Sequence, residues 1–244
     1  MSPGYREFTP RPELRNRVAC VWAGAARGYA RGVLPDGCVD IIWAPGSRLW
    51  IAGPDTAARP SSVPSGTALA GIRFLPGVAA EILGTPVSLL ADRRVPLSDC
   101  WPHDASRSLQ QRLDGAPCDG QIIAALEEAT LRRTSPPPDP AVRLTVLGIQ
   151  RRVALGMSCS GQAPWNLPIS GRQLRRRFVA AVGYGPKRFE RIMRFQHFLR
   201  LAGASGKGRG LATLAAEAGY ADQAHLSREC ASLAGSSPRM LMHD

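Results

Sequence analysis

The sequence predicts an α+β protein: an N-terminal antiparallel β-sheet or barrel with helices, followed by an all-α C-terminal domain with two helix-turn-helix units joined by a long helix. Three observations support this fold. Short runs of branched and aromatic residues, separated by turn residues, fill much of the first half of the chain. A proline-rich stretch at residues 135–140 then interrupts the chain, and two segments of the second half repeat each other.

The first half contains a hairpin signal. Asp36-Gly37 stands between two apolar runs within residues 31–43, and an Asp-Gly pair supplies the positive φ angles of a tight hairpin turn. Two further runs typical of strands and two stretches typical of helices follow, at residues 49–53 and 68–74 and at residues 78–84 and 121–133. The first of these helices is expected to end at Gly84. An antiparallel sheet followed by helices is the simplest assembly of these elements.

The proline-rich stretch also separates two regions of different charge. We predict an N-terminal domain at residues 1–134, a linker at residues 135–140 and a C-terminal domain at residues 141–244. Of the formal net charge of +12, residues 135–244 carry +10, and no acidic residue lies between Asp139 and Glu190. Such a concentration of basic residues favours a nucleic acid as the partner of the C-terminal half.

The composition argues against membrane and secreted proteins. Hydrophobic residues make up 44% of the chain, which is enough to build a core. No apolar run approaches the roughly 18 residues of a membrane-spanning helix. The N-terminus also lacks the apolar region of a signal peptide. We therefore expect a cytoplasmic protein without a membrane partner.

The sequence also shows no pattern of an enzyme or a metal site. The glycine-rich loops that bind nucleotides and the GxSxG motif of hydrolases are absent. The six cysteines are dispersed without a CxxC pair, so we expect buried thiols, no metal, no cofactor and no catalytic residue. Four tryptophans of the first half could line a small-molecule pocket, although such side chains more often belong to the core: Trp22, Trp43, Trp50 and Trp101.

An internal repeat organises the second half. The paired residues are Leu174 with Leu226, Arg176 with Arg228, Gly183 with Gly235, Pro186 with Pro238, and Phe189 with Leu241. Each segment predicts a helix with defined ends, because Ser170 can form a capping box with Gln173, Asp222 can cap the second helix, and the two paired glycines can end them. Residues 211–218 predict a further short helix, and Gly219 supplies a turn. Two such helices around a turn form a helix-turn-helix.

The second unit resembles the second helix-turn-helix of AraC/XylS-type transcription regulators. Its residues follow the family pattern small-xxx-Gly-aromatic, Asp-Gln-x-His-apolar-Ser-Arg and Gly-x-Ser-Pro. The matching residues are Ala215, Gly219, Tyr220, Asp222, Gln223, His225, Leu226, Ser227, Arg228, Gly235, Ser237 and Pro238. Residues 170–178 and 183–199 resemble the end of the first unit and the long joining helix, so the resemblance covers about residues 167–241. The first half is similar to the sensor-type domain of some actinobacterial members.

This resemblance implies a sequence-specific transcription regulator. Its partners would be double-stranded promoter or operator DNA and, for an activator, RNA polymerase. The first half would bind a small-molecule effector or mediate homodimerisation.

The residues expected to contact DNA lie on the two recognition helices. A recognition helix presents its first turns to base edges and its flanks to phosphates. The predicted contacts are Arg172, Gln173, Arg175 and Arg176 in the first unit and Gln223, Ala224, Ser227 and Arg228 in the second. Arg172 suits guanine, Gln223 suits adenine and Ala224 suits a thymine methyl group. We assign Arg176 and Arg228 to phosphates.

Other polar residues of these helices have competing roles. The Gln173 side chain could either cap the helix or contact a base. Residues 175–177 span roughly 200° of a helix, so these three arginines cannot all face DNA. His225 is expected to be structural. The inward face of the joining helix is expected to consist of Phe189, Ile192, Met193, Gln196 and Leu199.

The first unit departs from the family pattern. Pro164 and Pro168 fall where its first helix should lie, and an interior proline costs a helix about 3 kcal/mol. We therefore expect that helix to be shortened or displaced, and Arg172→Ala to weaken specific binding less than Gln223→Ala. The alternative is that residues 141–160 rebuild the support with a helix of their own, through Val142, Val146, Ile149 and Val153.

Two other classes of protein compete with the regulator. One is a small-molecule-binding protein whose DNA-binding half has degenerated in its first unit. The other is a DNA-repair methyltransferase fused to helix-turn-helix units. That chemistry uses a reactive cysteine, usually beside a four-cysteine zinc site, and no such spacing is present.

Overall fold

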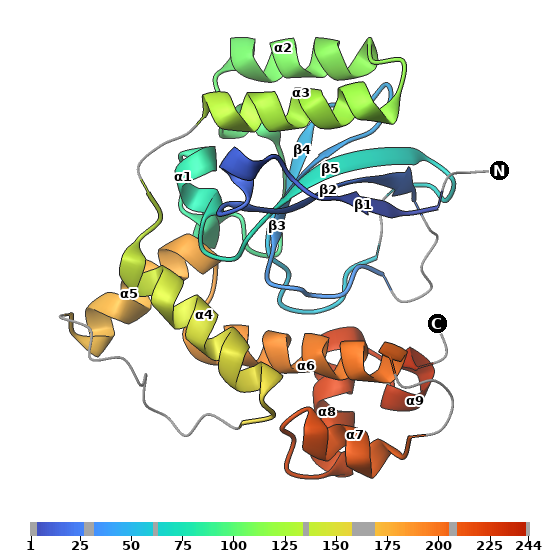
Figure 1. Cartoon of the computed structure of the whole chain (residues 1–244), viewed down its shortest axis with the longest axis vertical. Coiled ribbons are helices and arrows are strands. Elements are labelled where there is room, and N and C mark those ends of the chain that lie inside the picture. Colours follow the sequence, from blue (N-terminus) through green and yellow to red (C-terminus); the bar gives the residue numbers. More distant parts are fainter. Residues whose placement is uncertain are drawn as a thin grey trace.

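A computed structural model describes residues 4–26, 32–60, 63–133, 137–157, 169–204 and 209–242. Its first half contains a six-stranded antiparallel sheet with the order β1-β2-β5-β3-β4-β6 (Figure 1). The strands are β1 (Arg6–Phe8), β2 (Val18–Ala25), β3 (Val39–Trp43), β4 (Trp50–Ala52), β5 (Ala68–Phe74) and β6 (Arg94–Pro96). Among the described residues β1 and β6 form the two edges, so the sheet-or-barrel prediction resolves to an open sheet.

The two faces of this sheet differ in chemistry because side chains alternate along each strand. One face is apolar and packs in a core with two antiparallel helices, α2 (His103–Asp114) and α3 (Asp119–Arg132), which lie above the sheet in Figure 1. Ile41, Ile51, Ile72 and Phe74 on this face are fully buried. The opposite face carries Asp40 and other charged and aromatic side chains, and it borders a cavity.

Shorter helices complete the first half. They are η1 (Pro12–Leu14), α1 (Ala79–Leu83), η2 (Val87–Leu89) and η3 (Leu97–Asp99). Helix α1 ends at Gly84, whose φ of 69° is left-handed, which confirms the predicted glycine cap. The strands expected at residues 49–53 and 68–74 and the helix expected at residues 121–133 are also present.

The second half is helical. Its elements are α4 (Pro140–Ala154), α5 (Gly171–Val182), α6 (Pro186–Ala204), α7 (Leu211–Glu217), α8 (Gln223–Ala234) and α9 (Pro238–Leu241). These helices share one hydrophobic core, in which Phe178, Phe189, Phe195 and Phe198 of α5 and α6 are completely buried. Figure 1 shows α5 near one end of α6, and α7, α8 and α9 near its other end. None of the described helices is long and apolar enough to cross a membrane.

Two expectations about the first half are wrong. The segment before Asp36-Gly37 does not pair with β3, since both edges of β3 are occupied by β4 and β5. Gly37 does adopt a positive φ of 81°, but its turn directs the preceding segment toward α6 instead of closing a hairpin. The cysteines are also not uniformly buried, because Cys118 is exposed at the start of α3 and Cys38 and Cys100 are half-buried. Cys159 lies outside the described residues.

The two halves of the chain contact each other along α5, α6 and α8. Gly183, at the end of α5, lies so close to Pro54 and Val87 that a Cβ atom there would stand 2.7 Å from the Pro54 ring. The Gln196 side chain of α6 donates a hydrogen bond of 2.7 Å to the Pro35 carbonyl, and the Ala58 amide donates one of 2.7 Å to the Leu233 carbonyl. A change in the first half can therefore reach both helical units directly.

Candidate nucleic-acid interface and adjoining cavity

Helix α5 begins and ends as the sequence predicts. The Ser170 hydroxyl accepts a hydrogen bond from the backbone N–H of Gln173. The side-chain oxygen of Gln173 accepts one of 3.0 Å from the backbone N–H of Ser170, which completes the capping box. Gly183 ends the helix with a φ of 98°. The buried face consists of Leu174, Phe178, Ala181 and Val182. Among the described residues, those on the opposite face are exposed.

That exposed face carries the predicted contacts of the first unit. Arg172, Gln173, Arg175 and Arg176 are all exposed. Neither Arg172, Arg175 nor Arg176 has an ion pair with any acidic side chain that the structure describes. Arg177 behaves differently, because its guanidinium lies 3.4 Å from the carboxylate of Asp139, the residue that caps α4. Arg177 therefore links α5 to α4, whereas the other three arginines form a basic surface without ion pairs among the described residues.

Helix α8 repeats this design in the second unit. The Asp222 side chain accepts a hydrogen bond of 2.6 Å from the His225 amide, and Gly235 ends the helix with a φ of 62°. The buried face consists of Leu226, Cys230, Leu233 and Ala234. On the other face Gln223, Ala224 and Arg228 are exposed. Ser227 is half-buried, and its hydroxyl donates a hydrogen bond to the Gln223 carbonyl.

The turn between α7 and α8 is fixed by packing. Gly219 has a φ of 78°, and a Cβ atom there would stand 3.0 Å from the carbonyl oxygen of Gly156, just after α4. Tyr220 is buried, and its ring lies edge-on to that of His225 at 5.3 Å. The His225 ring nitrogen Nδ1 also receives the Ala221 amide at 3.5 Å. These contacts give His225 a structural environment, in agreement with the role expected for it.

Part of the support of α5 comes from α4. Pro164 and Pro168 lie outside the described residues, so the first helix of the first unit is not seen. Helix α4, however, is present, and the four residues named for the alternative are all buried in the shared core: Val142, Val146, Ile149 and Val153. Helix α4 packs against both α5 and α6, and η2 and α1 of the first half also pack against α5. The choice between the two interpretations of the first unit stays a prediction for DNA binding.

Helix α6 joins the two units. Its 19 residues correspond to a length of roughly 28 Å at about 1.5 Å per residue. Helix α8 packs along it, where Arg191 of α6 forms two hydrogen bonds of 2.9 Å with Glu229 of α8. The predicted inward residues Phe189, Ile192 and Met193 are buried. Gln196 and Leu199 are only half-buried, since they turn toward the first half of the chain.

A cavity of about 730 Å³ lies between the charged face of the sheet and the helical half. Strands β2 to β6 supply its floor, and Leu199 of α6 and Leu241 of α9 belong to its lining. Its volume is in the range of small-molecule sites. Of the four tryptophans considered, Trp22 and Trp50 line this cavity. Trp43 and Trp101 belong to the core, where their ring N–H groups donate to Asp114 and to the Ile82 carbonyl.

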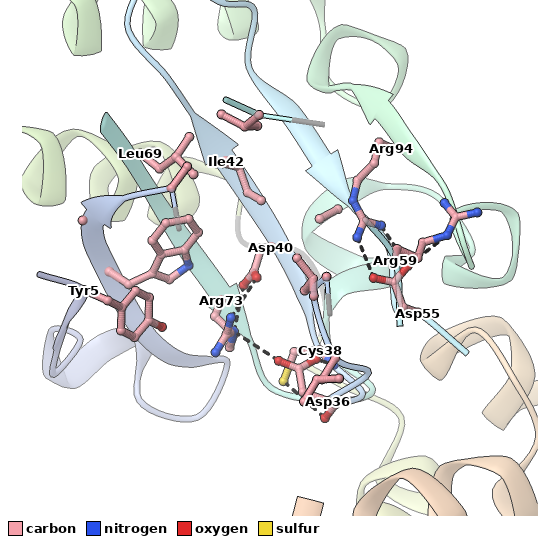
Figure 2. Close-up of a pocket in the computed structure, with 18 of the residues that line it drawn as sticks. Tyr5, Asp36, Cys38, Asp40, Ile42, Asp55, Arg59, Leu69, Arg73 and Arg94 are labelled. Atoms are coloured by element: carbon pink, nitrogen blue, oxygen red, sulfur yellow. Dashed lines mark hydrogen bonds and ion pairs between the residues drawn. The ribbon is translucent and has the colours of Figure 1, made fainter. Parts of the chain in front are cut away.

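Two clusters of ion pairs line the cavity (Figure 2). In the first, Arg73 forms two hydrogen bonds with Asp40, of 3.1 and 3.2 Å, and lies 3.6 Å from the carboxylate of Asp36. In the second, Arg94 forms two hydrogen bonds with Asp55, of 3.0 and 2.5 Å, and Arg59 lies 3.9 Å from the same carboxylate. Burial raises the pKa of Asp40, and the Arg73 charge opposes that rise.

The sequence did not indicate these clusters. Asp40 and Arg73 each stand within an otherwise apolar strand, which is an unusual place for a charge. That signal could have marked both residues as partners on the second face of the sheet. Among the described residues, no group of three or more His, Cys, Asp or Glu side chains is arranged to hold a metal ion.

Two family descriptions match the chain. Residues 6–96 match a family described as "Domain of unknown function (DUF6597)", and residues 166–243 match one described as "Helix-turn-helix domain". No curated protein matches.

The chain is also similar to solved structures of ToxT. That of ToxT from Vibrio cholerae O395 has 8% sequence identity and a TM-score of 0.45, with 91% of this chain and 96% of that chain covered. The same protein bound to (E)-4-(8-methylnaphthalen-1-yl)but-3-enoic acid has 9% identity and a TM-score of 0.42, with 98% and 97% covered. Such values carry no argument about function, which rests here on the sequence match to residues 166–243 and on the two capped recognition helices. The C-terminal half of the chain contains an AraC-type helix-turn-helix domain, and the protein is a DNA-binding transcription regulator.

Proposed function

We propose that α5 and α8 enter two successive major-groove segments of one promoter or operator site. The observation that carries this proposal is the pair of capped helices whose exposed faces carry basic and polar side chains, with α6 joining the two units. Capping hydrogen bonds and left-handed glycines define the backbone at both ends of each helix. A helix that is already formed loses less backbone conformational entropy when it binds than a segment that folds on binding.

Base recognition is assigned to the first turn of each helix. Arg172 is exposed and unpaired among the described residues, and its planar guanidinium suits the two acceptors of guanine. Gln223 follows the capping residue Asp222, and its exposed side-chain amide has no hydrogen-bond partner in the described ranges of the chain. This amide suits adenine, with Ala224 beside it for a thymine methyl group. The Gln173 side-chain oxygen is used by the capping box, so only its NH₂ group remains for DNA.

Phosphate contacts are assigned to Arg175, Arg176 and Arg228. Affinity should then depend steeply on salt, since each phosphate contact releases counterions. For three phosphate contacts the full-length protein is expected to lose roughly fortyfold in affinity between about 50 and 200 mM salt. Fluorescence anisotropy with a labelled duplex measures this slope, and a salt-independent interaction would exclude the proposed surface.

Arg228→Ala and Gln223→Ala are expected to act differently. Removal of Arg228 should weaken binding to all duplexes about equally and lower the salt slope by about 1, since phosphates carry no sequence information. Removal of Gln223 should change the preferred base at one or two positions, at a cost of roughly 1–3 kcal/mol on the preferred site. Selection of bound sequences from a random duplex pool separates the two outcomes. An unchanged selected motif with Gln223→Ala would refute the base-reading assignment.

The first half is proposed to bind a small-molecule effector in the cavity that borders the charged face of the sheet. This cavity is large enough for such a ligand and includes two residues of the DNA-binding half, Leu199 and Leu241. The domain limits at residues 134 and 141, homodimer formation and contact with RNA polymerase stay predictions.

Regulation without catalysis is favoured over the methyltransferase alternative. A reactive cysteine needs a lowered thiol pKa. Burial instead raises the pKa of Cys38 and Cys100, and it raises the pKa of Cys20 and Cys230 to about 12. The exposed Cys118 has no cluster of possible zinc ligands around it within the described part of the chain. The alternative of a degenerate DNA-binding half predicts that the full-length protein binds no duplex, which the anisotropy experiment tests.

A further inference from the structure

We propose that the cavity binds a dipolar small molecule, with a cationic group at the Asp36–Asp40 end, an anionic group at the Arg59–Arg94 end and an apolar body between them. This inference deepens the proposed function, because the ligand would occupy the effector cavity. Its binding step can nevertheless be tested in the absence of DNA.

The two clusters have opposite net charge. At one end a single guanidinium, that of Arg73, faces the two cavity-lining carboxylates of Asp36 and Asp40. At the other end a single carboxylate, that of Asp55, faces the two guanidinium groups of Arg59 and Arg94. One end therefore has an unbalanced negative charge and the other an unbalanced positive charge. A ligand with one charge of each sign neutralises both ends, which a simple cation or anion cannot do.

Strand register places these charges in one row across the sheet. Arg73 of β5 is paired with Asp40 of β3, Asp40 with Ala52 of β4, and Ala52 with Arg94 of β6. Neighbouring strands are about 4.8 Å apart, so Asp40 and Arg94 are separated by roughly 10 Å. The small side chain of Ala52 leaves the floor between them open. Figure 2 shows Arg73 and Asp40 on one side of the view and Arg94, Arg59 and Asp55 on the other.

A second row supplies an apolar floor beside the first. Trp22 is paired with Gly71, Gly71 with Ile42, and Ile42 with Trp50. A Cβ atom at Gly71 would stand 2.6 Å from the Trp22 ring, so the glycine allows that ring to lie across the sheet. The Trp22 ring N–H is buried and has no hydrogen bond of ordinary geometry within the described part of the chain. It lies close enough to the Asp40 carboxylate to lower the pKa of that group, so it belongs to the acidic end of the cavity.

The acidic end of the cavity is also the point of contact with the DNA-binding half. Asp36 lies between Pro35, whose carbonyl receives the hydrogen bond from Gln196, and Gly37, whose Cα faces Phe189 and Met193. All three of these partners belong to α6, the helix that joins the two helix-turn-helix units. A cation held by Asp36 would therefore act on the segment that packs against α6, and so on the relative placement of α5 and α8.

Isothermal titration calorimetry on the full-length protein without DNA tests the binding step. The probes are 8-aminooctanoic acid, octylamine and octanoic acid, which share one chain length and differ only in their charged ends. We expect the amino acid to bind at least tenfold more tightly than either singly charged probe. Equal affinities, or tighter binding of octanoic acid or octylamine than of the amino acid, would overturn the proposal.

Crossed variants assign the two ends. Asp36→Asn should weaken the binding of 8-aminooctanoic acid and of octylamine but not that of octanoic acid. Arg59→Gln should weaken the binding of 8-aminooctanoic acid and of octanoic acid but not that of octylamine. The Arg59 side chain is 43% exposed and that of Asp36 is 33% exposed, so neither change leaves a buried group unpaired. Arg48→Gln, at an exposed residue that does not line the cavity, is the control. Equal effects on all three probes would contradict the assignment of ends.

The coupling step is read from DNA affinity. Saturating 8-aminooctanoic acid should change the affinity of the full-length protein for a selected duplex by about fivefold or more, as is usual for coupled sites. Gln196→Leu, which removes the bond to Pro35, should reduce that change. DNA binding that the ligand does not change would refute the coupling alone. Absence of DNA binding under all conditions would refute the proposed function, and the calorimetric test of ligand binding would still stand, because it is done without DNA.

Discussion

Replacing Arg172 and Gln223 together by alanine is expected to abolish most of the sequence preference of the protein. Each lost bidentate base contact costs roughly 1–3 kcal/mol, and the two residues lie in different units, so their effects should add to roughly 2–6 kcal/mol. Binding to unrelated duplexes should fall far less, because the phosphate contacts of Arg176 and Arg228 persist. Competition between the selected duplex and a scrambled duplex measures this difference.

A matched control removes the same types of side chain elsewhere. Arg143 on α4 and Gln121 on α3 are both exposed and lie outside the two recognition helices. The Arg143→Ala, Gln121→Ala double variant should keep the ratio of specific to non-specific affinity within about twofold, the scatter expected of neutral surface changes. Equal losses in the two double variants would mean that net charge, and not base recognition, determines the binding.

Gly183→Ala is expected to destabilise the protein more than Gly235→Ala, although both glycines end a recognition helix in the left-handed region. An alanine costs about 1–2 kcal/mol at such a φ angle in either position. At Gly235 the new Cβ atom meets nothing within 4 Å, whereas at Gly183 it stands 2.7 Å from the rigid Pro54 ring and 3.3 Å from Val87. Overpacking adds roughly 1–3 kcal/mol at Gly183.

Urea denaturation of the two variants gives the comparison. A larger loss for Gly183→Ala would show that the end of α5 packs against the first half of the chain in solution. It would also connect the first recognition helix with the segment after β4 that carries Asp55. Similar losses for both variants would mean that the two halves are not in contact there.

The helical half follows from local signals in the sequence. The Ser170–Gln173 capping box, the Asp222 cap and the left-handed glycines at 183 and 235 each involve residues within a few positions of one another. Such interactions form whatever the distant parts of the chain do. The apolar spacing of Leu174 and Phe178 likewise marks the buried face of α5 before any partner is known.

The first half was harder to predict because its features depend on distant partners. The Asp36-Gly37 turn has the predicted positive φ at Gly37, yet the identity of the neighbours of β3 is decided by β4 and β5, far along the chain. Helix α2 was missed because only Ser106, Leu109 and Leu113 are buried on it, too few to stand out. The ion pair of Asp40 and Arg73 arises only when β3 and β5 adopt their register.

Footprinting of the full-length protein on a selected duplex tests the central claim most directly. The claim is that both recognition helices engage DNA, with α6 joining the two units. We predict two protected major-groove segments about one helical turn apart, of which Arg172→Ala weakens one and Gln223→Ala the other. A single protected segment that Arg172→Ala leaves unchanged would contradict this account, and would instead support the weakened first unit that Pro164 and Pro168 suggest.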